Sequence, residues 1–140
     1  MELSGQPASR QQGLYLLKAG QIDEAIDLFT QLEKADPDDP QIHTYLGAAY
    51  CRKGDKLHAV WEFEESLRLE ESAANYYNLG AMYESLHRID EAVREYLTAV
   101  ELDPSHARAV QAVERLKNQY QSEHQSRDEE TAGPNGDETQ

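Results

Sequence analysis

Cysteine is almost absent from this chain, because Cys51 is the only one among 140 residues. A single cysteine excludes a disulfide within the chain. Long apolar runs are also lacking, since no segment approaches the ~18 consecutive apolar residues of a membrane-spanning helix. The first ten residues have no apolar core of the kind found in signal peptides. We therefore expect a cytoplasmic protein without direct membrane insertion.

Basic residues are scarce as well. The chain has 13 lysines and arginines against 27 aspartates and glutamates, which gives a formal net charge of −14. Nucleic acids and anionic membranes are recognised through basic surfaces. The composition therefore argues against both as partners.

The sequence has no glycine-rich phosphate loop, no CxxC pair and no HExxH motif. His58 and Glu62 are four residues apart on one predicted helix, but two ligands do not make a metal site. No residue near Cys51 in the sequence supplies a general base. We interpret Glu62, Glu64 and Glu65 as part of a solvated helix face. We therefore expect a protein that is not an enzyme, with no catalytic residue, metal or cofactor.

What the sequence does have is an internal repeat. Three segments superimpose at spacings of 34 and then 33 residues, and each contributes one glycine, one alanine and one aromatic residue to the shared pattern. The coincident sets are Gly13, Gly47 and Gly80; Ala25, Ala59 and Ala92; and Phe29, Phe63 and Tyr96. Such a period is typical of a solenoid, in which each unit needs a neighbour to bury its apolar face.

The third repeat carries a complete family signature: Tyr76, Leu79-Gly80, Tyr83, Ala92, Tyr96, Ala99 and Pro104. The second has His43, Ser66 and Glu71 where the signature has an aromatic residue, alanine and proline, and the first keeps Gly13, Ala25, Phe29 and Pro37. Residues 6–106 thus resemble the tetratricopeptide repeat family. The resemblance implies an all-α, right-handed solenoid of three helical hairpins. The repeats cover about 6–39, 40–72 and 73–106.

Glycines and caps give the expected helix ends. Gly20 and Gly54 stand where the first helix of a hairpin should end in a left-handed conformation, and His87 takes that place in the third repeat. Asp39, Asp55 and Asp103 are candidate N-caps, and the first and last of these precede a proline. We expect helices near 7–19, 22–35, 40–53, 56–69, 73–86 and 89–102.

A seventh helix is predicted at about 104–122, where it would close the array and complete a domain that covers residues 1–122. Its apolar residues recur at helical spacing on one face: Ala109, Val110, Val113, Leu116 and Tyr120. Residues 123–140 are acidic and have no large apolar residue. We expect this tail to be disordered.

In the tetratricopeptide family, the first helix of each repeat lines a concave groove that binds a partner segment. The resemblance implies these groove residues here: Arg10, Leu14, Lys18, Thr44, Tyr45, Arg52, Tyr77, Asn78, Arg108, Gln111 and Arg115. Five of them are basic in a strongly acidic protein. A basic groove with tyrosine and asparagine side chains suits an extended acidic peptide. The alternative is that these arginines and lysines only pair with neighbouring acids.

One subfamily holds the C-terminal carboxylate of heat-shock chaperones in a two-carboxylate clamp of lysine, asparagine and arginine side chains. The corresponding positions in this chain hold Arg10, Leu14, Tyr45, Ala74 and Asn78. Only the first is similar to the clamp. The sequence therefore argues against binding of chaperone tails by that mechanism.

The repeat register also predicts an exposed apolar pair on the outer helix of repeat two, Leu57 and Trp61. An exposed tryptophan beside a leucine is a plausible contact anchor. The alternative is that Trp61 folds back over a neighbouring helix edge. We thus predict an adaptor or scaffold that binds a protein partner in its groove, or alternatively an assembly protein that self-associates through the convex face.

Overall fold

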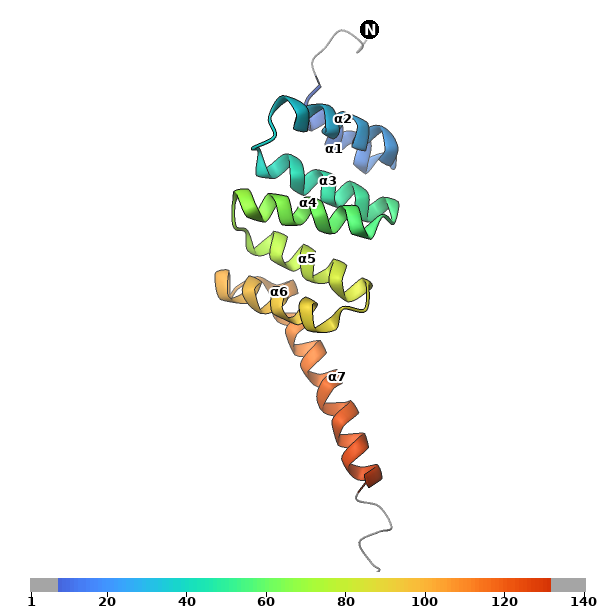
Figure 1. The fold of residues 1–140 in the computed structure, drawn as a ribbon, viewed down its shortest axis with the longest axis vertical. Helices are drawn as coiled ribbons and strands as arrows, with labels where there is room; N and C mark the ends of the chain where they lie inside the picture. Colours follow the sequence, from blue (N-terminus) through green and yellow to red (C-terminus); the bar gives the residue numbers. More distant parts are fainter. Residues whose placement is uncertain (1–7, 132–140) are drawn as a thin grey trace, which may run out of the picture.

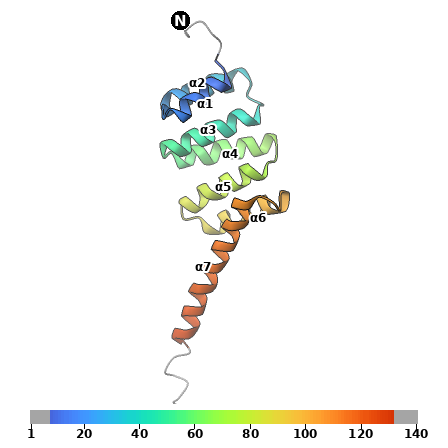
Figure 2. The ribbon, with the colours of Figure 1, turned by 180° about the vertical axis from the view of Figure 1, so that it is seen from behind.

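The computed structural model describes residues 8–131, which form helices and connecting turns without any strand in that range. The helices are α1 (Arg10–Lys18), α2 (Ile22–Ala35), α3 (Pro40–Lys53), α4 (Lys56–Leu69), α5 (Ala73–Ser85), α6 (Ile89–Leu102) and α7 (Ala107–Thr131). The first six pair into three hairpins that stack along one axis, and α7 projects from the end of the stack (Figures 1 and 2). The predicted all-α solenoid is confirmed.

The repeat glycines allow the two helices of each hairpin to pack closely. Each glycine lies against an aromatic ring of the second helix, so that an added Cβ would overlap the ring. The pairs are Gly13 with Phe29, Gly47 with Phe63, and Gly80 with Tyr96. At Gly80 the Cβ would be 2.7 Å from the Tyr96 ring and 3.2 Å from the carbonyl oxygen of Ala92. This contact explains why the first helix of each repeat keeps a glycine.

The hairpin turns have the backbone conformation that the sequence predicts. Gly20 and Gly54 have φ angles of 80° and 89°, and His87 follows them with a φ of 61°. This conformation lets the chain reverse direction after α1, α3 and α5. The third turn carries the cost of a side chain in the left-handed region.

Two of the three predicted N-caps are confirmed. Asp39 accepts a hydrogen bond from the backbone N–H of Gln41 at the start of α3, and Pro40 is the first residue of that helix. Asp55 accepts one from the N–H of His58 at the start of α4. These contacts satisfy backbone donors that a helix start leaves unpaired.

The prediction for Asp103 is wrong. Asp103 follows the last residue of α6, and its carboxylate accepts from the N–H and the hydroxyl of Ser105 within the connecting turn. Helix α7 begins at Ala107, and the Nδ1 atom of His106 accepts from the N–H of Ala109 instead.

Helix α7 also differs from the prediction at its far end. It closes the array only through its first part, where Ala109, Ala112 and Leu116 are buried, whereas Tyr120 is 62% exposed. The helix then continues to Thr131, through residues that the sequence analysis assigned to a disordered tail. Glutamine, glutamate and arginine are good helix formers, and no glycine or proline interrupts the segment. The rest of the predicted tail, 132–140, lies outside the described residues.

The core follows the stack in two consecutive apolar clusters. One joins α1, α2 and α3, with Phe29 and Leu46 among its most buried residues. The other joins α4 to α7 around Phe63, Tyr83 and Tyr96. Among the described helices, none is both long enough and apolar enough to cross a membrane.

Candidate functional site

Seven of the eleven predicted groove residues line two surface hollows. The first hollow, of about 450 Å³, contains Thr44, Tyr45 and Asn78. The second, of about 410 Å³, is lined by Tyr77, Arg108, Gln111, Ala112 and Arg115. The first is formed mainly by α3 and α5 with Ser66 of α4, and the second by α5 and α7. Arg10, Leu14, Lys18 and Arg52 line neither of them.

A buried polar network forms the wall of the first hollow. The Asn75 amide donates to the hydroxyls of Thr44 and Ser66, at 2.7 and 2.8 Å. Both hydroxyls also hydrogen-bond the carbonyl oxygen of Pro40, at 3.1 and 2.7 Å. The Asn78 amide donates to the side-chain oxygen Oδ1 of Asn75 at 3.4 Å. The network fixes α3, α4 and α5 relative to one another at the groove wall.

Sequence reasoning missed Asn75 and Ser66, which are 5% and 0% exposed. A signal was available, because Ser66 stands where the family signature has alanine. A hydroxyl at a buried position needs a hydrogen-bonding partner, and that partner had to come from a neighbouring helix. Asn75 could have supplied it.

Two of the predicted groove arginines link α1 to α3. Arg10 forms an ion pair with Asp39 and donates to the side-chain oxygen of Gln41. Arg52 donates to the backbone carbonyl of Leu17. Because both guanidinium groups have partners within the fold, they offer less to a ligand than their charges suggest.

Glu84 connects three helices beside the second hollow. Its carboxylate accepts two hydrogen bonds from Arg115 of α7, at 2.6 and 2.8 Å, and one from the hydroxyl of Tyr96 in α6 at 2.8 Å. The hydrogen bond from Arg115 is the main cause that lowers the pKa of Glu84, with a smaller contribution from Tyr96. Arg115 is thus partly neutralised in the folded protein.

Arg108 and Lys18 are different. Within residues 8–131, neither has a carboxylate at ion-pairing distance, and both are exposed. The alternative interpretation, that the basic residues pair with neighbouring acids, therefore describes Arg10 and Arg115 but neither of these two. Asp39 and Glu70 also line the first hollow. The positive excess of the groove is thus smaller than the sequence positions suggest.

The groove tyrosines are held by other rings. Tyr45 lies against Phe29, with ring centroids 5.4 Å apart. Tyr77 contacts both Tyr96 and His106, at 5.6 and 5.4 Å. Rings fixed in this way present contact area with little loss of freedom on binding.

Leu57 and Trp61 are exposed, as the repeat register predicts. Their exposed fractions are 69% and 50%. Together with His58 and Glu62 they line a shallow hollow of about 470 Å³. The Trp61 ring packs against that of His43 in a T-shaped arrangement, with 6.3 Å between centroids. The exposure is confirmed, whereas a contact role for the pair stays a prediction.

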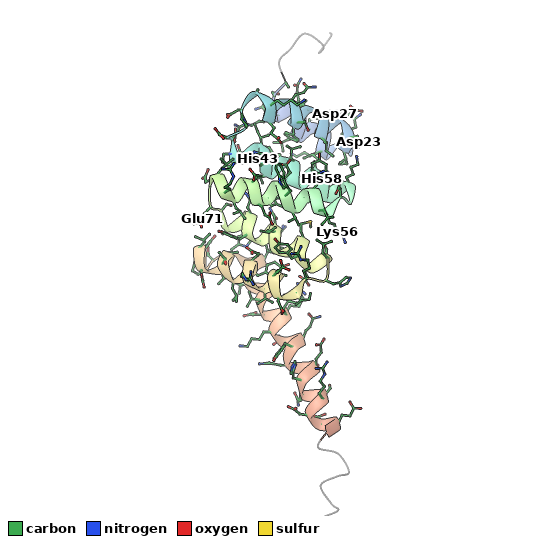
Figure 3. The ribbon with its side chains drawn as sticks, viewed as in Figure 1. Asp23, Asp27, His43, Lys56, His58 and Glu71 are labelled. Carbon is green, nitrogen blue, oxygen red and sulfur yellow. The ribbon has the colours of Figure 1, made fainter. Side chains whose placement is uncertain are left out.

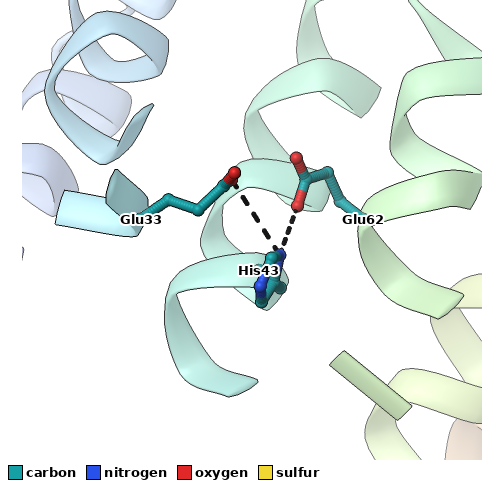
Figure 4. Close-up of side chains that lie close together, drawn as sticks. All are labelled: Glu33, His43 and Glu62. Carbon is teal, nitrogen blue, oxygen red and sulfur yellow. Dashed lines mark hydrogen bonds and ion pairs between the residues drawn. The ribbon is translucent and has the colours of Figure 1, made fainter. Parts of the chain in front are cut away.

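The expectation that Glu62 belongs to a solvated face is wrong. Glu62 is 5% exposed, and its carboxylate lies 2.7 Å from Nδ1 of His43. Glu33 of α2 approaches the same nitrogen at 4.0 Å, so that α2, α3 and α4 each contribute one side chain (Figure 4). Burial is the main cause that raises the pKa of Glu62, to about 7, and the charge of Glu33 adds to it. Sequence reasoning also missed His43. The signal for it was a histidine at a position where the family signature has an aromatic residue.

His58 and Glu62, which are four residues apart on α4, have different partners in the structure. The Nδ1 atom of His58 lies 2.6 Å from the carboxylate of Asp55, while Glu62 pairs with His43. Figure 3 shows His43 and His58 at separate places on the α3–α4 hairpin.

Comparison with known families agrees with this geometry. A family model described as a tetratricopeptide repeat matches residues 10–76, and a second with the same description matches residues 73–106. The chain belongs to the tetratricopeptide repeat family.

Two curated relatives illustrate its place among tetratricopeptide proteins. Human RNA polymerase II-associated protein 3 is 28% identical over 118 residues, which cover 84% of this chain and 18% of that protein. Heat shock protein STI1 of Saccharomyces cerevisiae is 29% identical over 115 residues, which cover 81% of this chain and 20% of that protein. The chain therefore spans about a fifth of the length of these relatives.

Solved tetratricopeptide domains have the same fold. The first such domain of Spaghetti (RPAP3), bound to the HSP90 peptide SRMEEVD, has a TM-score of 0.75 and 27% identity over 79% of this chain and 89% of that one. The first domain of human RPAP3 has a TM-score of 0.74 and 27% identity over 83% and 92%. MamA, with a TM-score of 0.71 and 24% identity over 74% and 61%, shows the fold alone.

Proposed function

We propose that this tetratricopeptide protein is a non-catalytic adaptor that binds an acidic segment of a partner protein in its concave groove. The observation that carries this proposal is the hollow beside α7. There Arg108, which has no carboxylate partner within residues 8–131, lies with the polar Gln111 and the fixed ring of Tyr77. A cation, an amide and an aromatic surface are suited to an acidic peptide.

The comparisons support a peptide as the ligand. A similar tetratricopeptide domain, that of Spaghetti, was solved with the acidic peptide SRMEEVD. This chain differs from the clamp subfamily at four positions, which hold Leu14, Tyr45, Ala74 and Asn78. We therefore expect an acidic peptide to be held mainly at the end of the groove near α7, and more weakly than by a complete clamp.

Fluorescence anisotropy with labelled SRMEEVD and its analogue SRMQQVN, in which amides replace the acidic side chains, tests the proposal. The acidic peptide should bind more tightly at low ionic strength, and the difference should shrink as salt screens exposed charges over ~8 Å. Arg108→Ala should weaken binding of the acidic peptide about tenfold, as expected for loss of a charged hydrogen bond.

Lys117→Ala is the matched control. It removes one positive charge from the same helix, but Lys117 lines a different hollow, with Ile89 and Leu97 of α6. The affinity of the Lys117→Ala variant for the acidic peptide should stay within about twofold of that of the parent protein. Failure of SRMEEVD to bind, or equal effects of the two substitutions, would contradict the proposal.

A second candidate function is self-association through the convex face. It is favoured by the exposure of Leu57 and Trp61 around one hollow. Light scattering coupled to gel filtration tests it, because the mass should rise above the 15.9 kDa of one chain as concentration increases. Trp61→Ala should abolish that rise. A mass that stays monomeric over the accessible concentrations would remove this candidate.

A further inference from the structure

We propose that Glu33, His43 and Glu62 form a binding site for a divalent transition-metal ion of the zinc class. The three side chains come from three consecutive helices, and one ligand atom of each lies within 4.8 Å of the others (Figure 4). His43 and Glu62 are buried, and Glu33 is half-buried. The site is separate from the groove that the proposed function uses.

The orientation of His43 is fixed by a backbone contact. Its Nε2 atom lies 2.9 Å from the carbonyl oxygen of Pro37, which can only accept a hydrogen bond. Nε2 therefore carries a proton, and Nδ1 is the atom that faces the two carboxylates. Metal-binding histidines generally donate their second N–H to a carbonyl or carboxylate in this way.

The two carboxyl groups lie close together without a fixed positive charge beside them among the described residues. Within residues 8–131, no lysine or arginine lies at ion-pairing distance from Glu33 or Glu62. Only His43 is close to both, at 4.0 and 2.7 Å. Like charges that are buried together disfavour ionisation. A divalent cation would balance both carboxylates, whereas a single proton on the imidazole balances one.

The separations are close to those of a zinc site. Zinc binds imidazole nitrogen and carboxylate oxygen at ~2.0–2.2 Å in tetrahedral geometry, so that its ligand atoms lie roughly 3.3 Å apart. The observed separations from Nδ1, 2.7 Å and 4.0 Å, lie on either side of that value. The longer one belongs to Glu33, whose side chain is 27% exposed and can adjust.

The site also has an access route and an open position. Glu62 lines the hollow beside Trp61 and Leu57, and the side chain of Glu33 is partly exposed to solvent. Three protein ligands leave a fourth tetrahedral position for water. The imidazole ligand favours zinc or a similar ion over calcium and magnesium, which prefer sites built from oxygen alone.

Zinc titration of the full chain tests the proposal. We would measure Zn²⁺ binding by calorimetry at neutral pH in a Cys51→Ser background, because the exposed thiol of Cys51 could itself bind zinc. One ion should bind per chain. Trp61, the only tryptophan, should change its emission on binding, because its ring contacts that of His43.

Glu33→Gln is the decisive variant. The substitution keeps the His43–Glu62 contact and alters a half-buried side chain, so the fold should survive. Zinc affinity should nevertheless fall at least about tenfold. Glu62→Gln should have at least the same effect. His58→Gln is the control, because it removes an exposed histidine that also lies beside a carboxylate, and it should leave zinc affinity unchanged.

Two outcomes would overturn the proposal. One is the absence of stoichiometric zinc binding by the folded parent protein. The other is zinc binding that Glu33→Gln leaves intact or that His58→Gln removes. Circular dichroism of each variant would show that loss of binding does not reflect loss of the fold.

Discussion

At the level of single residues, the contact between a glycine and a ring sets the distance between the helices of each hairpin. Gly80 and Tyr96 show this most clearly, because the ring is almost completely buried and its hydroxyl is held by Glu84. The ring cannot move aside without loss of that hydrogen bond. The glycine is therefore kept despite its cost of about 1 kcal/mol in a helix interior.

We predict that Gly80→Leu destabilises the fold by about 1–3 kcal/mol or more through overpacking against Tyr96. Chemical denaturation would measure the change. Ala74→Leu is the control on the same helix, because Ala74 is exposed, and its effect should stay within about 0.5 kcal/mol. Equal midpoints for the Gly80 variant and the parent would show that the contact is not required.

Trp61 gives a second prediction at this scale. Trp61→Ala should cost about 1–2 kcal/mol, because half of the ring is already in solvent. The equivalent truncation of Phe63, which is 3% exposed, should cost about 3–5 kcal/mol. In dilute protein the emission of Trp61 should be quenched by iodide. Emission that iodide cannot reach would contradict the exposure on which the convex-face candidate depends.

At the level of elements, the end of the array is held by a few contacts. Helix α7 packs on the third hairpin through Ala109, Ala112 and Leu116. Glu84 adds a polar link, because it joins α5 to α6 through Tyr96 and to α7 through Arg115. Both kinds of contact precede residue 117, and residues 117–130 are exposed.

The link through Glu84 should make stability depend on pH. Its pKa is lower in the folded state than its ordinary value of 4.5, mainly because of Arg115. The stabilisation is therefore present above pH ~4.5 and is lost as pH falls through the lower folded pKa. Glu84→Gln should cost about 1 kcal/mol or less at pH 7, since solvent screens the pair.

Denaturation of parent and Glu84→Gln variant at pH 7 and at pH ~3 would test this prediction, with the second pH chosen below the ordinary range of a glutamate. The difference between the two proteins should shrink at the lower pH. A difference that persists unchanged in acid would mean that the ionised carboxylate is not the stabilising form.

A chain that ends at Ser122 should keep the melting temperature of the full protein. The deletion removes only exposed residues among those described, so the effect should be within about 0.5 kcal/mol. Its helical circular dichroism should fall slightly, because α7 continues to Thr131. A chain that ends at Val113 is the contrasting control, since it loses the buried Leu116 and should melt earlier.

At the level of the whole molecule, the fold is a linear array. Helices pack mainly on their neighbours in sequence, and the two apolar clusters follow one another along the stack. The stability of such an array is close to a sum of units and their interfaces. The first and third repeats should therefore influence each other only through the second.

This arrangement predicts additivity across the array. Phe29→Leu and Tyr96→Phe alter different clusters, and their effects on unfolding free energy should add within about 0.5 kcal/mol. Phe63→Leu and Leu79→Ala alter the same cluster and should deviate from additivity by more. Double-mutant cycles from denaturation curves measure both. A large coupling between Phe29 and Tyr96 would contradict the linear description.

The repeat sequence by itself determined the family, the three hairpins and most helix ends. These follow from local chemistry: glycines at turns, aspartates at helix starts, and small and aromatic residues at a fixed period. The exposure of Leu57 and Trp61 could be predicted in the same way, because equivalent positions in the other repeats are charged or polar.

Only the tertiary structure decided which side chains meet across helices. The pairing of Arg10 with Asp39 and of Arg115 with Glu84, the hydrogen bonds from Asn75 to Thr44 and Ser66, and the approach of Glu33 and Glu62 to His43 all join residues 9 to 31 positions apart. Periodicity gives the face on which a residue lies, but a side-chain contact depends on the spacing and rotation of neighbouring helices. For the same reason the sequence predicted a basic groove, whereas in the structure Arg10 and Arg115 pair with acids and Arg52 donates to a backbone carbonyl. Arg108 and Lys18 are the groove cations for which residues 8–131 supply no ion pair.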